Sequence, residues 1–464
     1  MQKLLIILFI FCSHTILAKD YQVKLQVTNL PTDAKPVLLR IYNGNLFVVD
    51  SMAVRENNNL IFQIPANTSP GTFKVLLGMI SRNPGMAPPI PVITDFLFNH
   101  ENITLKLDFN DPANTIEVIE SKENKLYFDF LKSDIKFYQK LGLLEQIVIG
   151  YPEKDEFYQK ALEYYNKAQH EHNKFIDKTY KSNPKSLAAR IIKNQKIPIT
   201  LGKLTPEQRD SIFRNEFLSQ IDFSDTTLLY TNIYTDKIFQ YIKMCMKETM
   251  SPRENEANCI RAIDYIVPLL DVNPIVQQHL LHFLIAGFES TMHMEEVLAH
   301  ISSNYLQQCG SSSDVVKRRL EGYRRMAIGE KVPDLNLIDL QGTPFNLYSD
   351  VTPYTLILFW HTACSHCQLL MKQLAVLDQK GLFSNQQIKI IGISIDDSKD
   401  AWEKFTANYP LKWVNTHTEG SFESSVASDY NLFATPTMFL IDSEHKIIAK
   451  PTTSGELEKN INSL

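Results

Sequence analysis

"FWHTACSHCQLL", residues 359–370, places a Cys-x-x-C pair between two apolar stretches. The residues before the pair, 355–360, predict a buried strand, and those after it, 364–380, have the spacing of a helix. If Cys364 begins that helix, its sulfur lies among backbone N–H groups at the positive end of the helix dipole, which stabilises a thiolate. Cys367 then faces the same side, one turn deeper.

This arrangement predicts a redox pair. Cys364 is the expected exposed nucleophile, and Cys367 is the buried thiol that resolves a mixed disulfide. His366 lies between them, where its imidazole can favour the thiolate and tune the reduction potential. The alternative for His366 is a solvated residue at the helix start. Trp360 is expected to pack in the core or line the substrate groove.

A second element, "ATPTMFLID" (434–442), supports the same chemistry. Thr435 and Pro436 stand directly before an apolar strand. Proline at such a position is often only an edge residue. A cis bond here would instead turn the chain and expose the backbone of Thr435 to an extended substrate.

The N-terminus predicts export from the cytosol. Lys3 supplies a positive charge, Leu4 to Leu17 is an apolar run, and Ala18 is a small residue at which a secretory signal would be cleaved. The run is short for a membrane span, and an uncleaved anchor is the alternative. We therefore expect the protein in the periplasm or cell envelope, where disulfide chemistry is available.

Composition limits the other classes of function. A chain of 464 residues is too long for one core. A net charge of −5 with scattered basic residues indicates no nucleic-acid partner. The chain has 6 cysteines, of which Cys12 lies in the signal, and these are too few for a disulfide scaffold. A disulfide between Cys245 and Cys259 stays open, with Cys309 then the odd thiol.

Three composition regimes follow the signal peptide, residues 1–18. Residues 19–120 contain short alternating runs, which predict an antiparallel β-sandwich. Residues 121–330 have apolar spacings of three and four and predict an all-α domain. Residues 331–464 alternate strands and helices, as in an α/β domain. The proline-rich segment 83–91 is interpreted as an exposed loop. One helical face is expected from the spacing of Tyr158, Leu162, Tyr165, Ala168 and His172.

Residues 331–464 resemble the thioredoxin-fold proteins of the TlpA/ResA type, which are extracytoplasmic thiol–disulfide oxidoreductases. The motifs that carry the resemblance are "PDLNLIDLQG", "FW…CSHC", "IGISIDD", "ATPT" and "FLID", in that order. It implies that Cys364 is the nucleophile, Cys367 the resolving thiol and Pro436 the cis-proline of the substrate groove. The upstream regions resemble modules found ahead of such domains in bacterial envelope proteins.

The resemblance also implies partners and a biological setting. Protein thiols and disulfides would be the substrates, and a membrane electron donor of the DsbD type would re-reduce the pair, as in proteins of cytochrome c maturation. No cofactor and no metal are expected beyond the redox-active disulfide Cys364–Cys367. The client protein and the oligomeric state are not indicated by the sequence.

Several residues depart from the family pattern. Ala363 replaces a tryptophan that often precedes the first cysteine, and Leu358 stands where thioredoxins carry a buried acid. Proton transfer must then depend on another group, such as a nearby Glu or His. The Ser-His pair between the cysteines leaves the direction of electron flow open, although we expect a reductase. Asp396 and Asp397 are interpreted as helix-start residues, and His417 as a surface residue.

Three alternatives compete with this interpretation. A zinc site would need more than the two thiolates, and no second Cys-x-x-Cys exists; His279/His282 and His293/Glu295 have metal-like spacing but no His-Glu-x-x-His. A peroxiredoxin would need a threonine at His361. A binding or scaffold protein with a vestigial thioredoxin fold is the third alternative, but it would need neither both cysteines nor the Thr-Pro turn.

Overall fold

The computed structural model describes residues 20–50, 54–56, 59–80, 89–202, 204–292, 294–309, 314–349, 352–408 and 413–464. These residues form two compact units. The first unit contains the described residues up to Lys247 together with Tyr265–Phe283, and the second contains Glu248–Asp264 and Leu284–Leu464. The predicted signal peptide lies outside the described residues. None of the helices described in these ranges combines the length and the apolarity that crossing a membrane requires.

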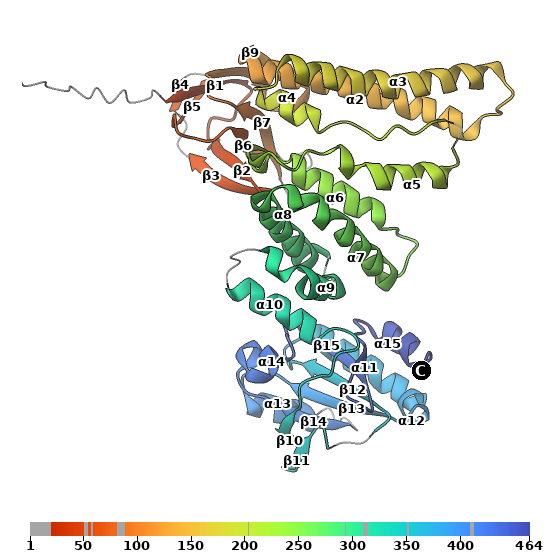
Figure 1. The fold of residues 1–464 in the computed structure, drawn as a ribbon. Coiled ribbons are helices and arrows are strands. Elements are labelled where there is room, and N and C mark those ends of the chain that lie inside the picture. The colour runs from red at the N-terminus through yellow and green to blue at the C-terminus, as the bar shows by residue number, and fades with distance from the viewer. Residues whose placement is uncertain are drawn as a thin grey trace, which may run out of the picture. The chain divides into compact units, whose positions relative to one another are not determined.

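The first unit begins with two β-sheets (Figure 1). One has the strand order β4-β5-β1-β8-β9 and the other the order β3-β2-β6-β7. The strands are β1 Tyr21–Thr28, β2 Val37–Tyr42, β3 Asn45–Asp50, β4 Val54–Glu56, β5 Asn59–Ile64, β6 Gly71–Ile80, β7 Ile90–Phe98, β8 Ile103–Asp108 and β9 Glu117–Glu120.

The two sheets share one hydrophobic core. Leu25 and Phe62 come from the first sheet, Phe73 and Phe96 come from the second, and all four are 0% exposed. The period-two pattern that predicted β1 is the reason, because alternate side chains of a strand point to one face. Burial along β1 alternates in this way from Val23 onward.

The expectation of purely antiparallel sheets was wrong. Strand β1 pairs antiparallel with β5 but parallel with β8. Only a tight hairpin forces two strands to run antiparallel, whereas β8 follows β1 after a long excursion through the other sheet. The direction of β8 therefore depends on the end of the sheet at which the chain re-enters it. The local alternation of apolar and polar residues does not encode that.

The proline-rich sequence led to a loop being expected where strand β7 begins. The sequence assigned 83–91 to a loop; residues 81–88 lie outside the described part, while Ile90 and Pro91 open β7. Pro91 pairs opposite Met79 of β6. Because β7 is the edge strand of its sheet, one side of its backbone needs no partner strand, and proline is tolerated there.

Helices make up the rest of the first unit. Two long ones, α2 and α3, run side by side (Figure 1). The face expected on α3 is buried along its whole predicted length, from Tyr158 to His172. The helices are α1 Pro112–Thr115, α2 Lys122–Gly150, α3 Glu156–Ser182, α4 Leu187–Lys193, α5 Pro206–Glu216 and α6 Ile233–Cys245.

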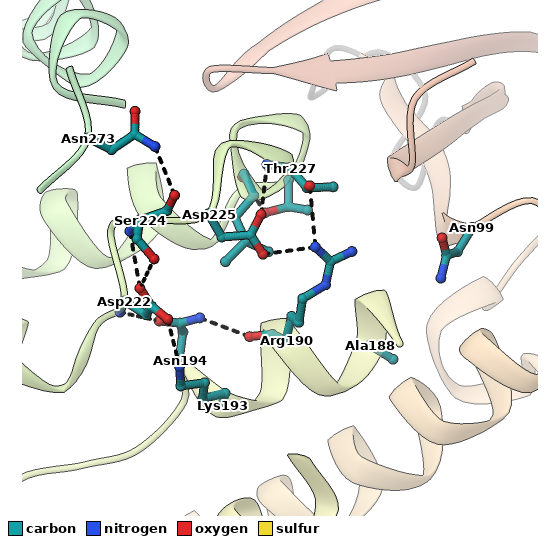
Figure 2. Close-up of polar contacts among 12 residues, drawn as sticks. Asn99, Ala188, Arg190, Lys193, Asn194, Asp222, Ser224, Asp225, Thr227 and Asn273 are labelled. Carbon is teal, nitrogen blue, oxygen red and sulfur yellow. Dashed lines mark hydrogen bonds and ion pairs between the residues drawn. The ribbon is translucent and has the colours of Figure 1, made fainter. Parts of the chain in front are cut away.

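A polar network holds α4 to the chain that leads into α6 (Figure 2). The Nη1 atom of Arg190 lies 2.9 Å from Oδ2 of Asp225, and Nζ of Lys193 lies 2.6 Å from Oδ2 of Asp222. The side chain of Asn194 accepts a hydrogen bond from the backbone N–H of Asp222 at 2.8 Å. The basic residues of α4 therefore position the loop before α6.

The predicted all-α region does not form a compact unit of its own. Helices α7 Pro252–Leu269 and α8 Pro274–Gly287 each contribute residues to both units, and α9 and α10 belong to the second. The domain boundaries expected from composition stay a prediction. Composition reports which residues are helical, whereas a compact unit is defined by which helices pack together.

The second unit contains the expected mixed α/β sheet, with the strand order β14-β13-β12-β15-β16. Its elements are α9 Glu295–Tyr305, α10 Asp314–Arg325, β10 Asn336–Ile338, β11 Pro344–Asn346, β12 Tyr354–Trp360, α11 Ser365–Gln379, α12 Leu382–Asn385, β13 Ile388–Ser394, α13 Lys399–Asn408, β14 Val414–His417, α14 Ser425–Asp429, β15 Thr437–Asp442, β16 Ile447–Ala449 and α15 Ser454–Ile461.

The central strand β12 separates two hydrophobic cores. Leu358 and Trp360 contribute to the core that α11 and α15 cover, and Phe359 contributes to the core on the opposite face. Strand β12 runs parallel to β13 and antiparallel to β15. A strand buried on both faces reads as a continuous apolar run, as "YTLILFW" does.

Candidate active site

The cysteine pair lies where β12 ends and α11 begins. Cys364 is the N-cap residue of α11, and its Sγ accepts a hydrogen bond from the backbone N–H of Cys367 at 3.1 Å. The backbone N–H of Cys364 donates to the carbonyl of His361 at 3.1 Å, which closes the turn between strand and helix. The sulfur therefore takes the place of the oxygen that usually satisfies the first N–H groups of a helix.

The two thiols differ in exposure. Cys364 is partly exposed, whereas Cys367 is 0% exposed and belongs to the same core as Trp360 and Met371. The helix explains the difference, since Cys367 begins the buried stripe of α11 that continues through Leu370. A bulky reactant can thus reach Cys364 first.

The two thiols also differ in acidity. Burial acts to raise the pKa of Cys364, but the hydrogen bonds from Cys367 and from the backbone N–H of His366 outweigh burial, so this pKa is lowered. Burial, and then the hydrogen bond with Cys364, raise the pKa of Cys367 to about 12. The pair therefore carries its first negative charge on Cys364.

Thr435 and Pro436 lie beside the cysteines. The start of β15 is next to the end of β12 because the two strands are antiparallel, with Phe359 opposite Thr437. The Thr435–Pro436 bond is cis, and the Sγ of Cys364 donates to the carbonyl of Thr435 at 3.4 Å. Both residues are partly exposed. Segments 71 residues apart thus meet at one sulfur.

The other expected site residues take different positions. The side chain of His366 is exposed, and its backbone N–H is the group that acts on Cys364. Trp360 is 0% exposed, so the structure supports the packing role considered for it and not a substrate-contacting surface. Leu358 is 1% exposed in the core that contains Cys367, so an apolar side chain occupies the site of the thioredoxin acid.

The sequence analysis underestimated Asp396. This carboxylate is 2% exposed and accepts hydrogen bonds from the backbone N–H of Thr362, at 3.1 Å, and from its hydroxyl, at 2.5 Å. The Nδ1 atom of His361 lies 3.1 Å from Oδ1 of Asp396. The helix-start role expected for Asp396 was wrong, because the Ser398 hydroxyl takes that place before α13.

A signal for Asp396 was nevertheless present in the sequence. It follows β13, which runs parallel to β12, and the carboxyl ends of parallel strands meet at one edge of a sheet. Its backbone carbonyl also accepts a hydrogen bond from Nε2 of His417 at 2.8 Å. His417, expected at the surface, stacks on the ring of Trp402 and is partly buried.

Two of the remaining cysteines are buried in the described part of the chain. Cys245 and Cys259 are buried thiols, so the disulfide considered between them is absent. The side chain of Cys309 and the whole of His293 lie outside the described part of the chain. Within that part, no three His, Cys, Asp or Glu side chains come together as metal ligands. His279 instead hydrogen-bonds the hydroxyl of Tyr42.

The contrast between the two thiols leads to a first prediction. We expect iodoacetamide to alkylate Cys364 of the reduced protein in a fast phase that persists below pH 8.5, about the pKa of an ordinary thiol. Cys367 should react only after unfolding, because it is buried and its pKa is about 12. Mass spectrometry of the labelled peptides over a range of pH measures both rates. Equal rates at the two cysteines would contradict this assignment.

Comparison with known proteins finds similarity to a described family and to named relatives. Residues 353–447 match the family model described as thioredoxin-like. The thiol-disulfide oxidoreductase ResA of Bacillus cereus is 27% identical over 126 residues, which are 27% of this chain and 70% of that protein. ResA of Bacillus thuringiensis subsp. konkukian is 26% identical over 143 residues, 30% of this chain and 80% of that protein.

A solved structure also aligns with this chain. The crystal structure of a thioredoxin-like protein from Bacteroides caccae is 19% identical, covers 57% of this chain and 97% of its own, and has a TM-score of 0.44. The family match, residues 353–447, includes both cysteines of the pair. The C-terminal part of this chain is therefore a thioredoxin-like domain similar to the ResA thiol-disulfide oxidoreductases.

Proposed function

We propose that this protein is an extracytoplasmic thiol–disulfide oxidoreductase that exchanges disulfides with protein substrates through Cys364 and Cys367. The observation that carries the proposal is the position of Cys364, whose partly exposed sulfur accepts the N–H of Cys367 at the start of α11. The similarity to proteins named thiol-disulfide oxidoreductase supports the same reaction class. The N-terminal sequence, with its positive, apolar and small-residue order, supports export.

The reaction follows from the two acidities. The Cys364 thiolate attacks one sulfur of a substrate disulfide; that S–S bond breaks, and the other substrate sulfur leaves as a thiolate. Cys367 then loses its proton and attacks Cys364, which forms the Cys364–Cys367 disulfide and releases the second substrate thiolate. The substrate gains two electrons and the pair loses two. Because the two sulfurs carry the electrons, no dissociable cofactor enters this scheme.

Other groups would bind the substrate, tune the reduction potential of the pair and re-reduce its disulfide. We assign the partly exposed Thr435–Pro436 segment to holding an extended substrate strand, since it borders the Sγ of Cys364. His366 would tune the pair through its exposed imidazole as well as its backbone N–H. A membrane electron donor of the DsbD type would re-reduce the disulfide.

Asp396 is the group that we assign to proton transfer. Cys367 must lose a proton whose pKa is about 12 before it can attack. The backbone N–H of His361 points to the Cys367 thiol, and the His361 ring contacts Asp396. His361 is partly exposed and Asp396 is buried, so together they connect the turn behind the cysteines with solvent. This pair would replace the acid that Leu358 excludes.

Exchange of each cysteine distinguishes the two roles. We expect Cys364→Ser to abolish insulin reduction in the presence of dithiothreitol, because the attacking sulfur is gone. Cys367→Ser should accumulate mixed disulfides with client proteins, because the resolving thiol is missing. Turbidity of insulin and non-reducing gels measure these effects. Parental activity in both variants would disprove the assignment and favour a scaffold role.

The direction of electron flow has its own test. We propose the reducing direction and expect a reduction potential near that of thioredoxin, about −270 mV. Full-length protein equilibrated in glutathione or dithiothreitol buffers and then alkylated gives the potential from the peptide that contains both Cys364 and Cys367. A value near about −120 mV would contradict the reductase and indicate a protein that oxidises its clients.

Removal of the Asp396 carboxylate tests proton transfer. A positioned base contributes about 10²-fold or more to such steps, so we expect Asp396→Asn to lower insulin reduction at pH 7 by at least tenfold. The loss should shrink as the pH rises, because hydroxide then deprotonates Cys367 directly. Asp397→Asn is the matched control, since Asp397 is exposed and adjacent. An unchanged pH profile in a folded Asp396→Asn protein would exclude the role.

A further inference from the structure

A cavity of about 670 Å³ lies in the helical region of the first unit, and neither cysteine of the redox pair lines it. Its walls come from α2, from the chain that follows α4, and from α5 and α6. The volume is within the range of small-molecule binding sites. The cavity reaches the surface, because Tyr138 and Lys243 in its wall are exposed.

Lys237 is the unusual residue of this cavity. Its side chain is only 5% exposed, although it lines the cavity. Its ammonium lies 5.0 Å from the centroid of the Phe217 ring. Among the residues that the structure describes, none accepts a hydrogen bond from this ammonium or forms an ion pair with it. Burying a charge without an acceptor costs free energy, which pairing with a bound anion would offset.

The cavity wall carries two lysines, Lys237 and Lys243, and one carboxyl group, that of Asp134. Burial lowers the pKa of Lys237 to about 8, while Asp134 and Asp236 raise it, so the ammonium stays largely charged at neutral pH. Burial also raises the pKa of Asp134 to about 6. His172, whose Nε2 is 3.4 Å from Oδ1 of Asp134, is neutral because burial lowers its pKa to about 4. Lys243 adds a second positive charge.

The rest of the wall is aromatic. Phe213 and Phe217 stack with their ring centroids 5.2 Å apart, and Tyr138 also lines the cavity. A ligand that enters must therefore offer an acceptor to a buried cation and apolar surface to the rings. An anion with an apolar body satisfies both conditions, because it pairs with the ammonium and displaces water from the aromatic wall.

We propose that this cavity binds a small organic carboxylate with an aromatic or branched apolar body. The carboxylate pairs with Lys237, and the apolar body packs against Phe213 and Phe217. Neither cysteine of the redox pair takes part, so this proposal and the proposed function can fail independently of each other.

The test uses the full-length protein and two matched probes, 1-naphthylacetate and its neutral amide, 1-naphthylacetamide. Titration calorimetry or ligand-observed NMR should show that the acid binds at least about tenfold more tightly than the amide, because only the acid can pair with the ammonium. Lys237→Met should weaken binding of the acid by at least about tenfold. Lys174→Met, at an exposed lysine of α3, is the control and should leave binding unchanged.

Three results would overturn the proposal. These are no saturable binding of the acid, equal affinities for acid and amide, or full affinity in a folded Lys237→Met protein. Replacing an unpaired buried charge by an apolar side chain of similar length is expected to keep or raise Tm, which a thermal melt checks. If that variant does not fold, the comparison of acid with amide on the unaltered protein decides the question alone.

Discussion

The backbone N–H of Cys367 and the Sγ of Cys364 form the contact on which the candidate site depends. It makes a sulfur the cap of α11, so the first orphan donors of the helix stabilise negative charge on that sulfur. The same turn of helix carries Cys367 into the core, where burial favours its protonated form. One local geometry thus gives two chemically identical thiols different exposures and different pKa values.

The sheet brings to the cysteines polar groups that the first turn of α11 does not contain. Strand β12 leads into this turn at one edge of the sheet. The parallel strand β13 ends at the same edge, and the antiparallel strand β15 begins there. The segment just before β15 supplies the carbonyl of Thr435, and the segment just after β13 supplies the buried carboxylate of Asp396. The carboxylate accepts hydrogen bonds from the N–H and the hydroxyl of Thr362, so it fixes the turn that leads into Cys364.

The two units use buried charge differently. In the second unit the buried Asp396 is satisfied by several donors, which is how proteins usually stabilise an internal charge. In the first unit the ammonium of Lys237 lines a cavity, 5.0 Å from the centroid of the Phe217 ring. An internal charge that the fold leaves without an acceptor lowers stability, so a bound anion is the simplest physical reason to keep it.

The sequence by itself determined the local features: the strand–Cys-x-x-Cys–helix order, the buried face of α3, and the apolar run of β12. Each depends on a periodicity of two or of three to four, which neighbouring residues encode completely. Only the tertiary structure decided the parallel pairing of β1 with β8, the meeting of Thr435 with Cys364, the contact of Asp396 with Thr362 and the burial of Lys237. These depend on contacts between segments far apart in the chain, and no local pattern records which distant segment becomes a neighbour.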